Sequence, residues 1–469
     1  MRSLICIVAL TLAQLTAPAR AQPAGADRAL VEQGRYLAAA GDCAACHGST
    51  FKGGDAVPTP IGAFYASNIT PDQANGIGAW SLQQFSDSLR KGRAPSGHLY
   101  PAMPYTAYTG LGDAEVQALY SYLMLGVKAV PSKPPPTDLS FPFVRAAMIP
   151  WNWLFLREGQ PTGAVPVDGA QRLRGSQLIE TLGHCSACHT PRGSLMQELA
   201  DKHLAGAAVG GWWAPNITPD PTGIGGWSDE KLATFLRTGH TDVAVAAGDM
   251  GTVVSRSLSQ LTPGDIDAAV AYLRALPMVA TQQLARSDTT KASMLDVAAI
   301  ERVADPSDWQ AQLDHSTRQG SLLYQSACAS CHGIDGRGSA GLVFPSLHLI
   351  NSVSAANAST LVQVISHGVD RSVGSRHALM PSFRTSLDDA QIASIANHVR
   401  EEFGGVKSDL SETDVAGILK GGPTNSWLIK NAKPLAVAVI VAVTLIVMLI
   451  AWIGWRAISR RASRSPSVS

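Results

Sequence analysis

The stretch GDCAACHGST, residues 41–50, places two cysteines three positions apart and a histidine directly after the second cysteine. The same C-x-x-C-H pattern returns in GHCSACHTPR, residues 183–192, and in SACASCHGID, residues 326–335. Three explanations are open for such a cluster: a metal clip, a redox disulfide, and the covalent attachment site of a haem.

The spacing of the clusters and their histidines decide between these explanations. A zinc ribbon needs two C-x-x-C pairs about 15–20 residues apart, because four ligands must converge on one ion. Here Cys43, Cys185 and Cys328 begin clusters that lie 142 and 143 positions apart. A redox disulfide has no use for a following histidine, and the chain has only 12 histidines, so three such neighbours are not a coincidence.

A c-type haem uses every residue of the cluster. On a short helix the two thiols lie on one face and bond to the two vinyl groups of the porphyrin, while the adjacent imidazole reaches the iron from that side. We therefore predict three covalently bound haems c. The predicted thioether cysteines are Cys43, Cys46, Cys185, Cys188, Cys328 and Cys331, and the predicted iron-binding histidines are His47, His189 and His332.

A second iron ligand is expected at each haem that only carries electrons, and a thioether raises the haem potential relative to an imidazole. Each third of the chain offers one methionine in an expected loop between helices, namely Met103, Met250 and Met380. We predict these three as the distal ligands. A loop methionine that merely fills a gap, or ligation by His98 or His377 instead, is the alternative.

The proximal imidazoles also need a partner that orients them. Such histidines commonly donate their other ring N–H to a backbone carbonyl. Pro215 and Pro345 mark the expected position of that carbonyl after the second and third clusters. Ser67 takes the corresponding place after the first cluster, where the same role is less expected.

Internal repeats indicate how the chain is divided. NITPDQANGIGAWS from Asn68 corresponds to NITPDPTGIGGWS from Asn216, and each block runs on into an expected helix. Each cluster follows a short expected helix that carries a glycine, which lets a neighbouring helix approach closely. These glycines are Gly34, Gly175 and Gly320. The expected fold is all-α, with three tandem class I cytochrome c domains and a C-terminal transmembrane helix.

Helix ends are also readable from the sequence. Ser81 and Ser228 are expected N-caps, with Gln84 completing a capping box, and Gly92 and Gly239 are expected left-handed C-caps. Thr262 with Pro263, and Ser386 with Asp389, are expected to start the closing helices of the second and third domains.

The two ends of the chain predict export and membrane anchoring. Residues 1–21 combine Arg2, a short apolar run and small residues before Gln22, as a cleaved secretory signal does; an uncleaved anchor is the alternative. Residues 435–455 contain no charge and, at ~1.5 Å per residue, reach about 31 Å, which is enough to cross a bilayer. The arginines that follow predict a cytoplasmic tail, and the signal predicts periplasmic haem domains at the bacterial inner membrane.

These observations give one order of segments. The expected order is a signal peptide (1–21), a first domain (22–130), a proline-rich linker (131–168), a second domain (169–280), a linker (281–310), a third domain (311–405), a stalk (406–434), the transmembrane helix (435–455) and a tail (456–469). The apolar block PWNWLFL, residues 150–156, is interpreted as a linker packed across the domain boundary, in preference to a contact with membrane or partner. The net charge of +1 predicts no nucleic-acid partner.

The clusters, the NITPD blocks, YPAMPY at residues 100–105 and GHCSACHTPRG at residues 183–193 together resemble the triheme cytochrome c subunit of bacterial membrane-bound alcohol, gluconate and aldehyde dehydrogenases. The resemblance extends to about residue 404. It implies that electrons from a periplasmic dehydrogenase large subunit, with or without a small subunit, pass from haem to haem to ubiquinone. The membrane span departs from the alcohol-dehydrogenase branch and favours aldehyde-oxidising and related hydroxylase complexes.

Three other functions remain open at this point. The chain could donate electrons to a terminal oxidase, or be a multihaem peroxidase, which requires an iron with an open sixth position. A binding module without haem is the third alternative. No flavin, nicotinamide or nucleophile motif is present, so substrate chemistry is expected in a partner rather than in this chain.

Overall fold

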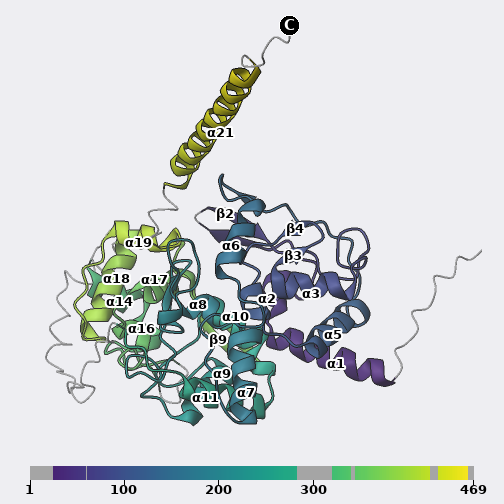
Figure 1. The fold of residues 1–469 in the computed structure, drawn as a ribbon. Coiled ribbons are helices and arrows are strands. Elements are labelled where there is room, and N and C mark those ends of the chain that lie inside the picture. Colours follow the sequence, from purple (N-terminus) through teal and green to yellow (C-terminus); the bar gives the residue numbers. More distant parts are fainter. Residues whose placement is uncertain (1–24, 60, 282–318, 340–343, 423–430, 463–469) are drawn as a thin grey trace, which may run out of the picture.

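The computed structural model of the chain describes residues 25–59, 61–281, 319–339, 344–422 and 431–462 (Figure 1). The predicted signal peptide, nearly all of the predicted linker 281–310 and the last residues of the predicted tail lie outside the described residues.

Helices dominate the described part of the chain. The first third contains α1 (Gly25–Ala40), α2 (Cys43–His47), α3 (Leu82–Lys91), α4 (Tyr105–Tyr108), α5 (Asp113–Ser121) and the π-helix η1 (Tyr122–Gly126). The middle contains η2 (Arg145–Ala147), α6 (Met148–Phe155), α7 (Ala170–Ser176), the π-helix η3 (Gln177–Leu182), α8 (Ser186–His189), η4 (Ala200–Lys202), α9 (Asp229–Thr238), α10 (Gly248–Arg256), η5 (Leu258–Gln260) and α11 (Pro263–Ala275). The last third contains α14 (Gly320–Ala327), α15 (Ala329–His332), α16 (Asn351–Ser354), α17 (Ser359–His367), α18 (Asp389–Glu402), α19 (Glu412–Leu419) and α21 (Ala432–Ala462).

Short antiparallel strands make the prediction of an all-α fold incomplete. They are β1 (Ala56–Thr59), β2 (Gly62–Tyr65), β3 (Arg93–Ala94), β4 (Gly97–His98), β5 (Asp138–Leu139), β6 (Ala207–Val209), β7 (Trp212–Ala214), β8 (Val369–Val373) and β9 (Arg376–Met380). The order β1-β2-β5 forms one small sheet, and β3-β4, β6-β7 and β8-β9 are hairpins. Glycines at the hairpin turns, such as Gly374 with φ 57°, allow the chain to reverse without strain.

One crossed helix pair recurs three times. Helices α1 and α5, α7 and α11, and α14 and α18 pack against each other. At each crossing a glycine touches the opposite backbone: a Cβ on Gly34 would lie 1.9 Å from the carbonyl oxygen of Ala118, and one on Gly175 or Gly320 would lie 2.0 or 2.2 Å from that of Ala268 or Ser394. No larger residue fits there, so the predicted close approach is confirmed.

Most predicted helix ends are confirmed. Ser81 accepts a hydrogen bond from the Gln84 amide in a full capping box, Ser228 accepts one from Lys231, and Gly92 and Gly239 are left-handed. Thr262 caps α11 with Pro263 in its first turn.

The predicted start of the last closing helix is wrong by two residues. Asp388, and not Ser386, caps α18. The Asp388 carboxylate accepts a hydrogen bond from the backbone N–H of Gln391, and Gln391 Oε1 accepts one from the backbone N–H of Asp388. The Ser386 hydroxyl instead donates to the Phe383 carbonyl.

Two groups of buried side chains form the core of the described residues. The larger group is a single cluster in space whose members lie between Leu37 and Leu276 in the sequence. It therefore joins the first two crossed helix pairs. The smaller surrounds α14, α17 and α18 in the last third. Hydrogen bonds connect the middle and last thirds of the chain. Trp213 N–H donates to Thr360 Oγ1 (3.2 Å), and Asn351 N–H donates to the Val243 carbonyl (2.9 Å).

Helix α21 extends away from the body of the molecule (Figure 1). Among the described residues, Ala432–Arg456 is the one stretch long and apolar enough to cross a membrane, and none of it is buried within the chain.

Candidate haem sites

The first cluster forms a single short helix, α2, that places Cys43, Cys46 and His47 together. It begins after Asp42 (φ 48°), which is left-handed, and is followed by Gly48 (φ 75°), so residues with positive φ bound it on both sides. The His47 ring is buried, and its Nδ1 lies 2.7 Å from the Ser67 carbonyl oxygen. A carbonyl can only accept, so Nδ1 carries the hydrogen and Nε2 keeps its lone pair for a metal.

The second and third clusters repeat the hydrogen bond of the histidine to a backbone carbonyl. His189 Nδ1 donates to the Pro215 carbonyl (2.7 Å), and His332 Nδ1 donates to the Pro345 carbonyl (3.1 Å). The expected role of both prolines is thus confirmed, with the proline's own carbonyl as acceptor. The lower expectation for Ser67 is wrong, because the acceptor that orients the imidazole is a backbone carbonyl, which any residue has.

The cysteines of the three clusters are thiols outside any disulfide, and several of them are strongly desolvated. All six described cysteines are free, and burial raises the pKa of Cys43, Cys185 and Cys328 to about 12 and that of Cys188 to about 11. Such thiols stay protonated at neutral pH while no metal or haem is bound. No three described His, Cys, Asp or Glu side chains converge on a point that could hold a bare metal ion.

The histidines are kept neutral by the same burial. Desolvation lowers the pKa of His47, His189 and His332, while the hydrogen bond to a carbonyl opposes it. A neutral imidazole with Nδ1–H fixed and Nε2 free is the form that binds haem iron. The donor set of each cluster therefore fits a covalently attached haem, which would be held by the two cysteines and ligated by the histidine.

The three candidate distal methionines lie in different kinds of structure. Met103 lies in the turn before α4, half-buried against the larger core, as the prediction of a loop requires. Met250 instead lies in the first turn of α10, and Met380 ends β9, so the prediction of loops is wrong for both. Both segments are short, and the sequence pattern does not distinguish them from loops.

Tyr108 connects the segments that lead into the first two clusters, and no sequence motif indicates this contact. The Tyr108 hydroxyl donates to the Gly41 carbonyl (2.7 Å), two residues before Cys43, and the Tyr108 ring packs edge-on against that of His184 at 5.7 Å between centroids. His184 directly precedes Cys185. Cys46 also contributes to the raised pKa of Cys188, so the two clusters lie within electrostatic range of each other.

Helix α10 lies beside α2 of the first cluster and near α8 and β9 (Figure 1). It contacts α2 of the first cluster, where Arg256 donates to the Ala44 carbonyl (2.9 Å). Asp249 raises the pKa of both Cys46 and Cys188. Strand β8 of the last third packs on the same helix, and the buried Arg371 guanidinium donates to the carbonyl of Ala246 just before it. Elements from all three thirds of the chain therefore surround α10.

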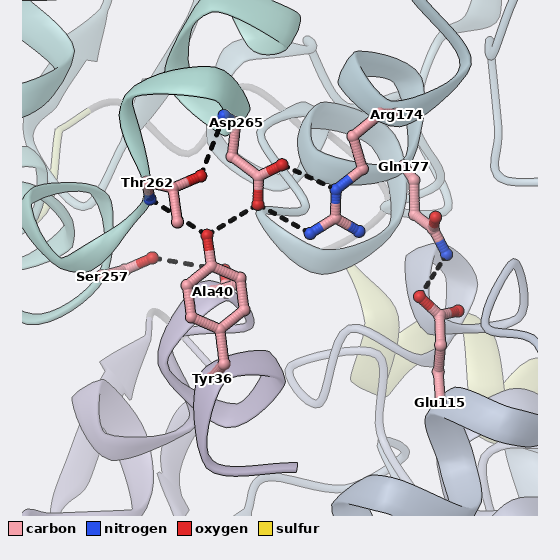
Figure 2. Close-up of polar contacts among 8 residues, drawn as sticks. All are labelled: Tyr36, Ala40, Glu115, Arg174, Gln177, Ser257, Thr262 and Asp265. Atoms are coloured by element: carbon pink, nitrogen blue, oxygen red, sulfur yellow. Dashed lines mark hydrogen bonds and ion pairs between the residues drawn. The ribbon is translucent and has the colours of Figure 1, made fainter. Parts of the chain in front are cut away.

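A polar cluster fixes the first two thirds relative to each other (Figure 2). Asp265 of α11 accepts two hydrogen bonds from Arg174 of α7 (2.8 and 2.7 Å) and one from the Tyr36 hydroxyl of α1 (2.6 Å). Nearby, the Ser257 hydroxyl donates to the Ala40 carbonyl (3.2 Å). These bonds hold the helix that leads into the first cluster against the helix pair of the second.

Family comparisons agree with the chemistry of the clusters. The family model described as Cytochrome c matches residues 31–125, and that described as Cytochrome C oxidase, cbb3-type, subunit III matches residues 315–399. These ranges contain the first and third C-x-x-C-H clusters. Cytochrome c domains carry covalently bound haem c.

Similar proteins cover most of the chain. It is 39% identical to the fructose dehydrogenase cytochrome subunit of Gluconobacter japonicus, across 96% of this chain and 94% of that protein. It is 36% identical to the cytochrome c subunit of the quinone alcohol dehydrogenase of Gluconacetobacter polyoxogenes, across 83% and 84% of the two chains. It is 35% identical to the gluconate 2-dehydrogenase cytochrome c subunit of Pantoea cypripedii, across 88% and 95%. The chain therefore belongs to the family of cytochrome c subunits found in fructose, alcohol and gluconate dehydrogenases.

Proposed function

We propose that the chain is a membrane-anchored triheme cytochrome c that carries electrons from a partner dehydrogenase to ubiquinone. The observation that carries this proposal is the packing around α10, which contacts α2 of the first cluster and β8 of the last third and carries Asp249 within electrostatic range of Cys46 and Cys188. Tyr108 also bridges the segments that lead into the first two clusters. Separate electron carriers would not need this shared packing, whereas a relay does.

Each cluster holds one haem in this proposal, which gives three per chain. Two thioether bonds would attach each porphyrin, to Cys43 and Cys46, to Cys185 and Cys188, and to Cys328 and Cys331. His47, His189 and His332 would bind the irons through Nε2, with Nδ1 held by the carbonyls of Ser67, Pro215 and Pro345. When bound, each haem supplies a one-electron iron couple.

Met103, Met250 and Met380 are the proposed distal ligands. Met103 is supported by its half-buried position against the same core on which Cys43 packs. Met250 is supported by its place on α10 next to Asp249, which lies in electrostatic range of Cys46 and Cys188. Filling the sixth position leaves the iron no site for peroxide, which argues against the peroxidase alternative.

The partner is proposed from the relatives. Fructose, alcohol and gluconate dehydrogenases each have such a cytochrome subunit, so a dehydrogenase large subunit that oxidises an alcohol, aldehyde, sugar or sugar acid is the proposed electron donor. The similarity to an oxidase subunit is confined to residues 315–399, whereas that to the fructose dehydrogenase subunit spans 96% of the chain. We therefore favour the dehydrogenase over the oxidase as partner.

Helix α21 is proposed as the membrane anchor in the bacterial inner membrane. Residues 435–455 carry no charged side chain and, apart from Thr444, present apolar side chains on every side, which no water-facing helix tolerates over this length. The arginines beyond it place the tail in the cytoplasm and the haem domains in the periplasm. This position brings the relay to the bilayer in which ubiquinone is dissolved.

A reconstitution assay tests the proposal. The tagged full-length chain is purified in mild detergent, the large subunit that accompanies it is identified, and the complex is supplied with that enzyme's substrate and a ubiquinone analogue. We expect substrate-dependent quinone reduction that is lost in a Cys328→Ser/Cys331→Ser variant. Isolation with a copper-haem oxidase, or quinone reduction that does not depend on the cytochrome clusters, would contradict the proposal.

A further inference from the structure

Helix α6 divides into a docked face and a free face. On the docked side the Trp151 indole N–H donates to the Leu195 carbonyl (2.8 Å), and Asn152 Oδ1 accepts from the Tyr105 hydroxyl (2.7 Å). Phe155 lies half-buried beside Trp151, with ring centroids 5.2 Å apart. This side confirms that the block packs across the boundary between the first two thirds of the chain.

The opposite face of α6 is wholly apolar and points away from the protein. Its exposed residues are Ile149, Pro150, Trp153 and Leu154, at positions i, i+1, i+4 and i+5, which form one stripe on a helix. Trp153 is 81% exposed, the largest fraction among the exposed large hydrophobic side chains described. Phe141 and Val144, just before the helix, are also exposed. A monomer in water rarely leaves such a patch uncovered.

Position and flanking charge favour lipid as the cover for this face. In Figure 1, α6 lies on the side of the body from which α21 extends, as do β2 and α19. Eight residues separate Gly422, the last described residue of the body, from Asn431, so the start of α21 lies at most about 30 Å from it. The exposed Arg145 and Arg157 flank α6. Cationic side chains at such positions can pair with the phosphates of lipid headgroups.

We propose that the exposed face of α6, with Phe141 and Val144, lies in the interfacial layer of the bilayer as a second membrane contact. This inference rests on the proposed membrane anchoring by α21. A tryptophan beside short apolar side chains is the composition that partitions into this layer. Two contacts, the spanning helix α21 and the surface helix α6, would fix the orientation of the haem domains on the membrane, which a single contact does not.

A depth measurement on the full-length chain tests this proposal. Cysteine is introduced as Trp153→Cys, labelled with the fluorophore NBD, and the haem-loaded protein is reconstituted into phosphatidylethanolamine and phosphatidylglycerol nanodiscs. Quenching by doxyl groups on the lipid chains is compared with quenching by aqueous iodide. Leu173→Cys on α7 is the matched control, because Leu173 is also an exposed apolar helix residue (57%) but α7 lies at the far end of the body in Figure 1. Val443→Cys within α21 reports on the membrane span itself.

The label at residue 153 is expected to be quenched severalfold more by doxyl lipid, and severalfold less by iodide, than the label at residue 173. Equal iodide quenching at 153 and 173, with lipid quenching at 443, would overturn the second contact while leaving the span intact. Iodide quenching at 443 as well would overturn both. Shielding of residue 153 from both quenchers only when the dehydrogenase subunit is present would overturn the proposal in favour of a protein contact.

Discussion

A backbone carbonyl orients the imidazole at each candidate haem site. The acceptors are the carbonyls of Ser67, Pro215 and Pro345, at 2.7–3.1 Å from Nδ1. The side chain at this position therefore does not take part in the hydrogen bond. The two prolines mark their sites in the sequence, but a carbonyl acceptor leaves no trace in residue identity at Ser67.

A substitution at Ser67 tests this explanation. We expect Ser67→Ala to leave haem content and the midpoint potential of the first haem unchanged, because the acceptor is retained. The measurement is a redox titration of the purified variant beside the wild type. A clear shift in one midpoint potential would show that the Ser67 hydroxyl, and not its carbonyl, matters at this site.

The proposed distal ligands are tested by removing a thioether. Met380→Leu is expected to lower the midpoint potential of one haem by a measurable part of the roughly 0.8 V that axial ligands span, because the thioether favours ferrous iron. The matched control is Met278→Leu, at an exposed methionine after α11, which should leave all potentials unchanged. If Met380→Leu also leaves them unchanged, Met380 is not a ligand.

At the scale of elements, the three crossed helix pairs depend on glycine. We expect Gly34→Ala to destabilise the protein by about 1–3 kcal/mol or more, because the new Cβ would lie 1.9 Å from the Ala118 carbonyl oxygen and must push the helices apart. Gly264→Ala in α11 is the control, since a Cβ there meets nothing within 4 Å and should stabilise the helix by about 0.5–1 kcal/mol. Denaturant unfolding of both variants gives the comparison, and equal stability would refute the packing argument.

The polar cluster between α1, α7 and α11 makes stability depend on pH. The pKa of Asp265 is lowered overall from 3.8. The hydrogen bond from Arg174 lowers it most, burial opposes this, and the hydrogen bond from Tyr36 lowers it further. A lowered folded-state pKa means that this stabilisation is present above about pH 4 and is lost as the pH falls through the folded-state value. Asp265→Asn should therefore cost about 1–2 kcal/mol at pH 7 and flatten the acid limb of the stability profile.

Asp267→Asn is the control for this prediction, because Asp267 is an exposed carboxylate on the same helix. Thermal unfolding between pH 3 and pH 7 is the measurement. An Asp265→Asn profile parallel to that of the wild type would mean that the cluster does not couple folding to protonation.

Local features of the elements were largely predictable, and contacts between distant elements were not. The caps at Ser81, Ser228 and Thr262 and the glycine at each helix crossing depend on neighbouring residues or on a single close contact, so the sequence carries their signal. The start of α18 was misplaced because Ser386 and Asp388 are both good capping residues two positions apart. The strands are too short to leave an alternating pattern.

At the scale of the whole molecule, the sequence indicated three clusters but not how they lie together. The continuous core from Leu37 to Leu276 joins two parts that the repeats present as separate. The contact between Tyr108 and His184, and the bond from Arg371 to the Ala246 carbonyl, connect residues far apart in the chain. No sequence motif indicates such pairs, because neither residue of a pair carries a local pattern that points to its partner.

The central claim is that every C-x-x-C-H cluster holds a redox-active haem in one relay. The most direct test is a spectroelectrochemical titration of the full-length chain in detergent, with protein quantified by amino-acid analysis and haem by its pyridine haemochrome. The account predicts three one-electron haem transitions per chain, with one of them absent in each double cysteine-to-serine variant. Two transitions per chain in the wild-type protein, or a cluster whose loss removes none, would contradict it.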